Sequence, residues 1–482
     1  MTDSDFQSWL KAGGRYVVLV EAQMDTPRYL STVPYTTLPT DTPANRAYYP
    51  IIAGGVAMSE SLPLDGSASL SAGDIEIHNE DGSLDSWLDE IWANRKVQVF
   101  IGDVTWPRID FRLIFDGIIS GIESRSASRL NIVLRDKLQR LNTPVTDAVL
   151  GGSTQNAERL QPITLGECHN IEPLLTNPSE HEYQCHSGTV ERIIEVRANG
   201  VPRNITTSGV PPGSFKLTAA PVGTITASVQ GFTPYTNTVA GLVKVLATQY
   251  GTPTERLTEA DLDITGLNSF DAANPQPVGI HLTDRSNVLQ CCQELAASIG
   301  SQVAMSRTGL LRLLKLDLPP SGSPIEVTPS DYVARSLEVS SRSNVIAGVR
   351  LGYCKNWTVQ TGLETGIPSE HKDLYEQEWL TVVARDSGVA GAYKIFAEPP
   401  QIDTLLLRKV DAQAEAERRL NLWKTQRTVY KFVGYSHLLT LELGQSITLY
   451  SPRFGLSSGK TGMVIGLNLD WVSRRATVEV LI

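Results

Sequence analysis

The chain carries two versions of one β-hairpin, at residues 117–135 and 462–481. Each version begins with a short apolar strand that has glycine at its first and fifth positions, starting at Gly117 in one and at Gly462 in the other. A polar turn follows, and the chain returns in a strand rich in β-branched residues, which is typical of a half-buried sheet. Two separated copies of one β-unit indicate a scaffold with internal pseudo-symmetry, because a catalyst needs no such duplication.

Length and composition describe a folded globular protein. The 482 residues predict about three domains. An excess of 52 acidic over 42 basic residues gives a net charge of −10, which disfavours general binding of nucleic acid but suits the wall of a channel through which polyanions slide without sticking. Five cysteines, two of them adjacent at Cys291 and Cys292, form no disulfide framework. With no signal peptide and no run of 18 apolar residues, we expect synthesis in a cytoplasm and no membrane insertion.

The pattern of strands and helices predicts an α+β chain that is β-dominated, with four regions. Residues 1–150 read as an N-terminal β-barrel-like domain, 151–235 as a small all-β domain, 236–324 as an α+β domain and 325–482 as a second β-barrel-like domain. The last region contains the strongest helix pattern, at residues 411–424, with acidic residues first and basic residues last, as the helix dipole favours.

Four further segments have clear local signals. Helical spacing predicts helices over residues 83–94, 239–250 and 286–299, the last with Asp284 or Ser286 as N-cap. Residues 24–50 hold five prolines and therefore predict an ordered loop or irregular edge rather than central sheet. We expect this loop to lie between subunits.

The one local concentration of metal-ligand side chains consists of Cys168, His169, His181, Cys185 and His186. A zinc site requires ligands that converge, usually with two to four residues between the members of a pair. Adjacent Cys-His pairs point to opposite sides of a strand, so both members rarely bind one ion. Cys168, His169, Cys185 and His186 are therefore weak metal candidates, and we predict neither a bound metal nor a cofactor.

No catalytic motif is present in the sequence. It has no Gly-x-Ser-x-Gly elbow, no His-Glu-x-x-His helix and no Gly-x-Gly-x-x-Gly loop. A glycosidase needs two carboxylates across a cleft, and nothing in the sequence pairs the available ones, which include Asp85, Asp89, Glu90, Glu376 and Glu378. We predict no catalytic residues and no enzymatic activity.

Six segments spread over nearly the whole chain carry a family resemblance. They are residues 40–45 (TDTPAN), 183–188 (YQCHSG), 221–231 (PVGTITASVQG), 356–360 (NWTVQ), 411–423 and 443–456. Together, and in a similar order, they resemble the baseplate hub or tail-tip proteins of long-tailed, siphovirus-like bacteriophages. Residues 160–190 look like a linker of that family in which Cys and His need not occur, which further weakens the metal hypothesis.

The resemblance implies two tube-like β-barrel domains per chain, and three chains that close a ring with pseudo-sixfold symmetry. Such a homotrimer would close the distal end of the tail tube in the virion. It would contact the distal tail protein ring, the tape-measure protein and central spike or fibre proteins for host attachment, and genomic DNA would only pass through its channel. Three alternatives remain open: a tail-associated glycan hydrolase, a carbohydrate-binding receptor module and a metal-bearing tail-tip protein. The sequence does not exclude a hexamer.

Overall fold

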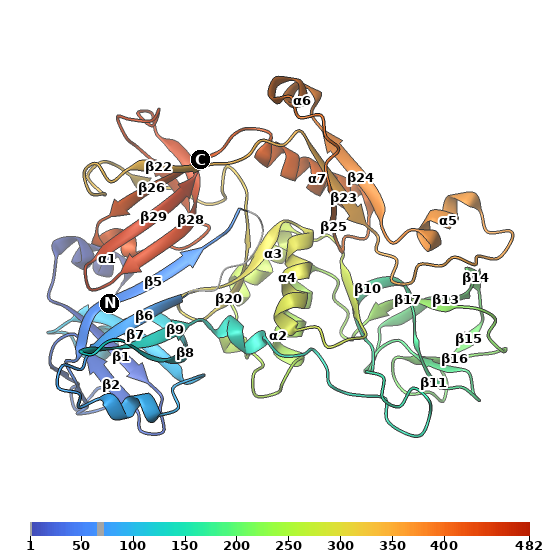
Figure 1. Cartoon of the computed structure of the whole chain (residues 1–482), viewed down its shortest axis with the longest axis horizontal. Coiled ribbons are helices and arrows are strands. Elements are labelled where there is room, and N and C mark those ends of the chain that lie inside the picture. The colour runs from blue at the N-terminus through green and yellow to red at the C-terminus, as the bar shows by residue number, and fades with distance from the viewer. Residues whose placement is uncertain (1, 65–71) are drawn as a thin grey trace. The chain divides into compact units, whose positions relative to one another are not determined.

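The computed structural model describes residues 2–64 and 72–482, which form two compact units (Figure 1). Unit 1 consists of Met1–Gln139, Ala304–Asn344 and Gln426–Ile482, and unit 2 of Arg140–Val303 and Val345–Thr425. Strands dominate both units, and helices lie between strands along the chain, which confirms the α+β, β-dominated class. The finer division at residues 150, 235 and 324 stays a prediction.

Unit 1 is built on one 13-stranded sheet in which β2-β1-β7-β8-β9-β6-β5-β28-β29-β26-β22 are successive neighbours, while β27 pairs with β28 and with β21. Its elements are α1 (Asp3–Ala12), β1 (Tyr16–Ala22), β2 (Arg28–Ser31), β3 (Tyr35–Thr36), β4 (Ala47–Tyr48), β5 (Ile52–Ser61), β6 (Ala72–His78), η1 (Asp85–Asp89), β7 (Lys96–Asp103), η2 (Arg108–Asp110), β8 (Arg112–Ser126), β9 (Arg129–Arg135), β20 (Leu311–Lys315), β21 (Ile325–Val327), β22 (Glu338–Arg342), β26 (Thr428–Gly434), η5 (Ser436–Thr440), β27 (Ser446–Leu449), β28 (Lys460–Asp470) and β29 (Arg475–Leu481). Among the described strands this path is open, so the two closed barrels implied by the resemblance stay a prediction.

The sheet of unit 1 contains the same five-strand arrangement twice. We call β5 to β9 copy 1, and β22 with β26 to β29 copy 2. In copy 1 the spatial order is β7-β8-β9-β6-β5, and in copy 2 it is β27-β28-β29-β26-β22. Numbered along the chain, both orders are third, fourth, fifth, second and first. A short 3₁₀ helix lies between the second and third strands of each copy, η1 in one and η5 in the other.

The two hairpins expected from the sequence are β8–β9 and β28–β29, and they match in detail. Both are antiparallel, and both contain a bulge at the same place: between Ile119 and Gly121 in β8, and between Val464 and Gly466 in β28. A bulge inserts one residue and twists the strand more strongly. The sequence prediction of a repeated hairpin is therefore confirmed, including the position of its second glycine.

A second correspondence between the copies is a backbone hydrogen bond from the first strand of each hairpin to the residue just before the neighbouring strand. The amide of Ile119 donates to the carbonyl oxygen of Arg95 at 2.8 Å, and the amide of Val464 donates to that of Gln445 at 2.9 Å. Both acceptors lie just before a third strand, β7 or β27. The repeat therefore extends beyond the hairpin.

One apolar core serves both copies. It contains Ile75, Ile132 and Phe115 from copy 1 together with Phe432 and Val478 from copy 2, each at most 2% exposed. Burying side chains of this size contributes roughly 1.5–3 kcal/mol each. The two copies are therefore parts of one folded body.

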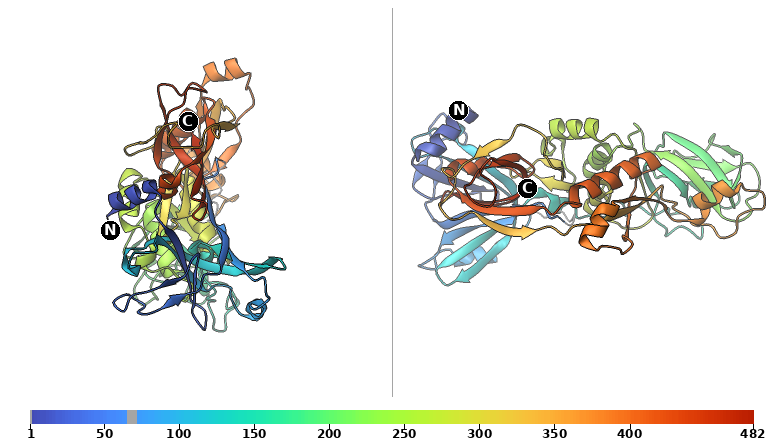
Figure 2. Two further views of the ribbon diagram at one scale, coloured as in Figure 1. Left: turned by 90° about the vertical axis from the view of Figure 1, so that its left-hand side faces the viewer. Right: turned by 90° about the horizontal axis from the view of Figure 1, so that it is seen from above.

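Unit 2 contains a five-stranded sheet (β14-β13-β17-β10-β18), a four-stranded sheet (β11-β12-β16-β15) and a three-stranded sheet (β24-β23-β25). Its elements are β10 (Ile163–Ile171), β11 (Leu174–Asn177), β12 (Glu182–Gln184), β13 (Arg192–Ala198), β14 (Val201–Pro202), β15 (Ile205–Thr206), β16 (Ser214–Leu217), β17 (Ile225–Gly231), α2 (Val239–Gln249), η4 (Glu259–Asp261), α3 (Ile264–Ala273), β18 (Gly279–Leu282), α4 (Val288–Ser298), β23 (Gly348–Tyr353), α5 (Ser369–Glu376), β24 (Leu380–Arg385), α6 (Ser387–Tyr393), β25 (Gln401–Asp403) and α7 (Lys409–Trp423). Helix α7 packs against β23 and β24 (Figure 2).

The boundaries of two predicted helices differ from the structure. The helix expected over residues 83–94 is only the 3₁₀ helix η1, because Asn79 accepts a hydrogen bond from the amide of Leu84 and the Trp92 indole donates to the carbonyl of Trp87. The helix expected over residues 286–299 is α4, which begins at Val288 with Asn287 as its N-cap, so the predicted N-caps Asp284 and Ser286 were wrong. Asp284 instead accepts hydrogen bonds from Ser286 and holds that residue in a turn. The helix expected over residues 411–424 is confirmed as α7.

The proline-rich segment of residues 24–50 is confirmed as an irregular edge. It contains only the short strands β2, β3 and β4, and β2 forms the end of the large sheet. Across the described residues, no helix combines the length and apolar character that spanning a membrane requires.

Candidate assembly site

The two copies of unit 1 join where β5 pairs antiparallel with β28. The register runs from Ser61 opposite Gly466 to Ala57 opposite Asp470. The amide of Leu62 extends the ladder by donating to the carbonyl of Ile465 at 2.7 Å. One copy therefore adds to the other by strand pairing.

Arg307, in the turn between Met305 and Leu311, holds this junction together. Its Nη1 and Nη2 donate to the carbonyl oxygens of Leu439 and Leu441 at 2.9 and 2.6 Å, at and just beyond the end of η5. Its Nε lies 3.2 Å from Oε1 of Glu60 on β5. The side chains of Arg307 and Glu60 are only 8% and 2% exposed. One guanidinium therefore connects η5 of copy 2 with β5 of copy 1.

The Glu60 carboxyl group lies buried at the junction, where its charged form is disfavoured. Burial raises its pKa, while the guanidinium groups of Arg307 and Arg312 oppose that rise. Neither carboxyl oxygen accepts a hydrogen bond of good geometry from the described residues, so Arg307 compensates it by charge alone. Removing Arg307 would take away the cation nearest to this buried carboxyl group, so we expect the pair to contribute to docking of the two copies.

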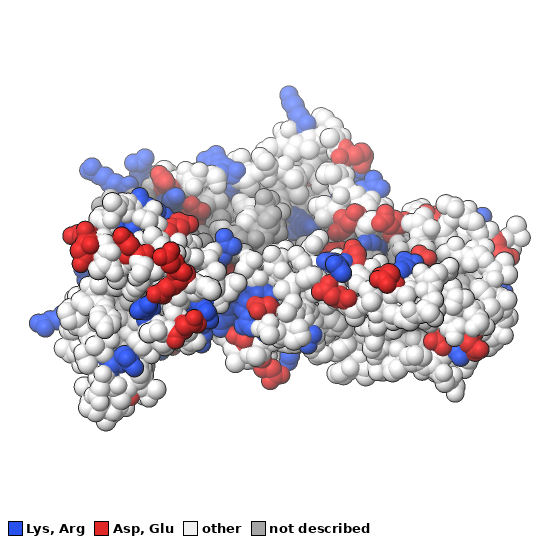
Figure 3. Space-filling view, turned by 60° about the horizontal axis from the view of Figure 1, so that its bottom comes forward, with Lys and Arg blue, Asp and Glu red and all other residues white. Residues whose placement is uncertain are grey.

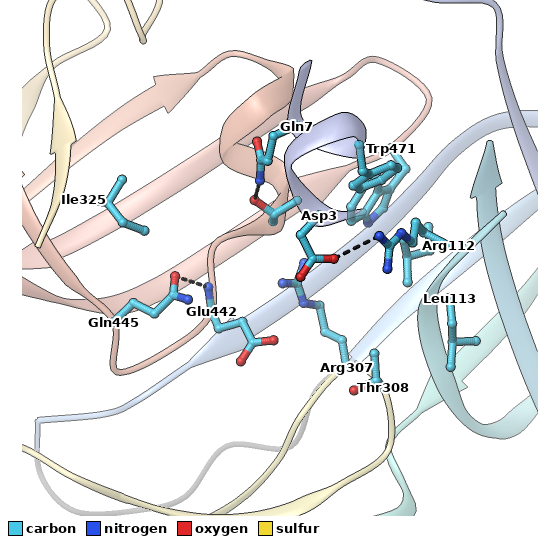
Figure 4. Close-up of a pocket in the computed structure, with 13 residues that line it drawn as sticks. Asp3, Gln7, Arg112, Leu113, Arg307, Thr308, Ile325, Glu442, Gln445 and Trp471 are labelled. Carbon is cyan, nitrogen blue, oxygen red and sulfur yellow. Dashed lines mark hydrogen bonds and ion pairs between the residues drawn. The ribbon is translucent and has the colours of Figure 1, made fainter. Parts of the chain in front are cut away.

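A cavity of about 440 Å³ lies beside this pair, lined by α1, β8 and the segment after η5 (Figure 4). Asp3 forms an ion pair with Arg112 at 2.9 Å, and the Gln7 amide donates to Thr440 at 2.5 Å. Glu442 forms an ion pair with Arg312 at 2.7 Å. Each of the charged residues that line the cavity already forms an ion pair, so the cavity favours the docking of α1 over the binding of a charged substrate.

The metal candidates of the sequence lie in unit 2 and have other partners. Cys168 and Cys185 are fully buried in one apolar cluster, and burial raises the pKa of both thiols. Nε2 of His169 lies 3.1 Å from the carboxylate of Glu167. Within residues 2–64 and 72–482, no three His, Cys, Asp or Glu side chains gather as a metal site would require. His181, in a turn before β12, has a left-handed backbone.

His186 instead belongs to a buried network around Thr164 that the sequence did not reveal. The Thr164 amide donates to Nδ1 of His186 at 3.0 Å, and the Thr164 hydroxyl donates to the carbonyl of Cys185 at 2.7 Å. Because that hydroxyl proton is used, Nδ1 of His281, 2.9 Å away, must donate to the Thr164 oxygen. Burial lowers the pKa of His186 to about 4 and that of His281 to about 3. Both imidazoles are therefore neutral structural groups.

The acidic residues considered for a glycosidase pair are divided between elements of the two units. Asp85 and Asp89 lie on η1 of unit 1 and are exposed, while Glu376 ends α5 in unit 2. A polar cavity of about 320 Å³ in unit 2 contains other carboxylates, among them Glu294, whose pKa is raised by burial. Lys355 at this cavity lies 4.0 Å from the ring centre of Trp357 and makes a cation–π contact.

The charged side chains on the face shown in Figure 3 are interspersed rather than segregated by sign. Neither a broad basic surface nor a broad acidic one covers that face. The net charge of −10 is thus not gathered into one patch there.

No family model matches the chain, and no curated protein matches its sequence. Among solved structures, the chain is similar to the tail protein from Neisseria meningitidis MC58, with a TM-score of 0.44, 11% identity and 97% of each chain covered. It is also similar to the 43 kDa tail protein of prophage MuSo2 from Shewanella oneidensis, with a TM-score of 0.43, 11% identity, and 96% of this chain and 98% of that chain covered.

A third similar structure is a chain in the virion of the native gene transfer agent particle, with a TM-score of 0.43, 12% identity, and 72% of this chain and 91% of that chain covered. These neighbours are tail and virion proteins, the class that the sequence resembles.

Proposed function

We propose that this chain is a structural, non-catalytic hub that closes the distal end of a phage tail tube in the virion. The observation that carries the proposal is the repeat of one five-strand arrangement within unit 1. A chain with two equivalent units supplies six units when three chains assemble. Three chains can therefore match a sixfold tube while remaining a trimer.

The proposed ring has several partners. The distal tail protein ring and the tape-measure protein would meet the hub on the tube side, and central spike or fibre proteins on the host side. Genomic DNA would cross the channel during ejection, and the net negative charge would limit its adhesion. Opening would follow from rigid-body or loop rearrangement rather than from a chemical step.

The test is the mass of the purified chain in solution, measured by light scattering. The proposal predicts a stable species at three times 52.6 kDa. A parallel assay of cell-wall and capsule glycans should show neither turnover nor binding by the chain. A monomer at all accessible concentrations, or glycan cleavage lost on mutating a pair of carboxylates, would contradict the hub.

A further inference from the structure

Two of the strand edges in unit 1 that no described strand covers belong to β22 and β8. Strand β22 pairs on one edge with β26 and has no described strand on the other. Strand β8 pairs with β7 only as far as Ile118, while β9 follows its opposite edge to Ser126. The edge of β8 over residues 121–126 is therefore open. Residues 123–126 are exposed, as is most of β22.

In the repeat, these two open edges correspond to the two edges that pair with each other inside the chain. Copy 1 uses β5 where copy 2 uses β22, and copy 2 uses β28 where copy 1 uses β8. Strand β28 carries β29 on one edge, and on the other carries first β27 and then β5. Strand β8 likewise carries β9 on one edge and β7 on the first part of the other edge. Where β28 next pairs with β5, β8 pairs with no described strand.

The internal junction also gives a register for the open edges. Aligning the copies through the strand pairings that they share makes Gly121 equivalent to Gly466, and Ser341 equivalent to Ser59. Since Asn468 pairs with Ser59, its equivalent Glu123 falls opposite Ser341.

Beyond this pair the register is interrupted, because β8 has a second irregularity between Glu123 and Ser126, and β22 has one between Val339 and Ser341. Glu123 and Ser341 are both exposed. The open edges therefore match in place and direction, with Glu123 opposite Ser341.

We propose that β22 of one chain pairs antiparallel with residues 121–126 of β8 in a second copy of this chain. The contact is heterologous, because each chain offers one edge and accepts the other, and such contacts close a ring when the rotation permits. It would cover both exposed edges, which are otherwise templates for aggregation. The inference rests on the ring assembly proposed above and names the strands that would build it.

Disulfide cross-linking between chains tests this pairing. All variants carry Cys354→Ser, since Cys354 is the one cysteine that is not fully buried. A mixture of the Ser341→Cys and Glu123→Cys chains should form a covalent dimer on mild oxidation, because directly opposed residues lie about 4.5–5.5 Å apart at Cα, within disulfide reach. The matched control pairs Ser341→Cys with Ser124→Cys, whose side chain points to the other face of the strand and should cross-link far less.

A single chain that carries both Ser341→Cys and Glu123→Cys reports on closure. A closed ring of three gives covalent products of up to three chains, whereas an open filament gives a ladder beyond three. A trimer by light scattering without the expected cross-link overturns this pairing and leaves the hub proposal standing. Cross-linked products larger than three chains keep the pairing and overturn the trimeric ring. A monomer without cross-links, or equal cross-linking in the control, overturns the pairing.

Discussion

Gly117 and Gly462, in two different hairpins, both lie so close to the partner strand that neither position has room for a Cβ atom. A Cβ atom on Gly117 would lie 2.4 Å from the carbonyl oxygen of Arg135, and one on Gly462 would lie 2.3 Å from that of Leu481. In both places the obstacle is the backbone of the partner strand, which cannot rotate away. The repeat therefore includes the reason for its first glycine.

Replacing either glycine by alanine should destabilise unit 1. We expect Gly117→Ala and Gly462→Ala each to lower the free energy of unfolding by about 1–3 kcal/mol, the usual effect of forcing extra atoms into a packed site. Urea unfolding followed by circular dichroism measures this. Gly121→Ala is the matched control on the same strand, since its Cβ would meet nothing within 4 Å. Equal losses for Gly121→Ala and Gly117→Ala would show that the close approach is not the cause.

The Arg307–Glu60 pair should be essential for stability. Arg307→Ala deprives the buried Glu60 carboxyl group of its nearest cation and two carbonyl groups of their donor, so we expect a loss of about 3–5 kcal/mol. Arg95→Ala is the control, because Arg95 pairs with Asp25, whose side chain is 88% exposed, and should lose no more than about 1 kcal/mol. Thermal or urea unfolding of both variants decides the point: similar losses would place the stabilisation elsewhere.

Unit 2 should lose stability in acid through His186. In the folded chain its pKa is about 4, below the ordinary value of 6.5, because the imidazole is buried. Below about pH 6.5 the unfolded state then binds more protons than the folded state, so stability falls as the pH drops toward 4, by roughly 3 kcal/mol. His186→Asn, which keeps an acceptor for the Thr164 amide, should flatten this part of the profile.

Urea unfolding at several pH values between about 7 and about 4 compares the profiles. His281 contributes in the same direction, since burial lowers its pKa to about 3, so some acid dependence should persist in His186→Asn. His371→Asn is the control, because His371 is exposed. An unchanged slope in His186→Asn would exclude His186 as a source of the acid sensitivity.

Thiol labelling should separate buried cysteines from a metal site. Burial raises the pKa of Cys168, Cys185 and Cys354, but only Cys354 is partly exposed. Iodoacetamide should therefore modify the native chain slowly and reach Cys354 first. Peptide mass spectrometry gives the order of modification. A chelator should leave that order unchanged, whereas faster labelling of Cys168 and Cys185 after chelation would favour a bound metal.

The local features of the fold were predictable from the sequence, and the long-range ones were not. Glycine spacing and β-branched residues predicted the hairpins at Gly117 and Gly462, and the helix pattern of residues 411–424 predicted α7, although its last turn contains no basic residue. The helix expected over residues 83–94 was mostly wrong, because the bonds made by Asn79 and the Trp92 indole do not follow from helical spacing. Backbone bonds set by distant partners override a local apolar period.

The junction residues gave no sequence signal at all. Glu60 and Arg307 are nearly 250 residues apart and belong to no motif, and only the pairing of β5 with β28 brings their elements together. The Thr164 network was missed for the same reason, since His281 approaches Thr164 across the pairing of β10 with β18. Single-sequence reasoning finds groups that are close along the chain, whereas these form through sheet topology.

The pairing of β5 with β28 also has a consequence for synthesis. A ribosome makes Ser61 roughly four hundred residues before Gly466, and such distant contacts form late in folding. During that interval the edge of β5 that pairs with β28 is unpaired, so a nascent or prematurely terminated chain exposes a strand edge that can pair with other chains. Only a polypeptide translated through β28 can cover it. The same ladder that unites the two halves would thus keep incomplete products out of the particle.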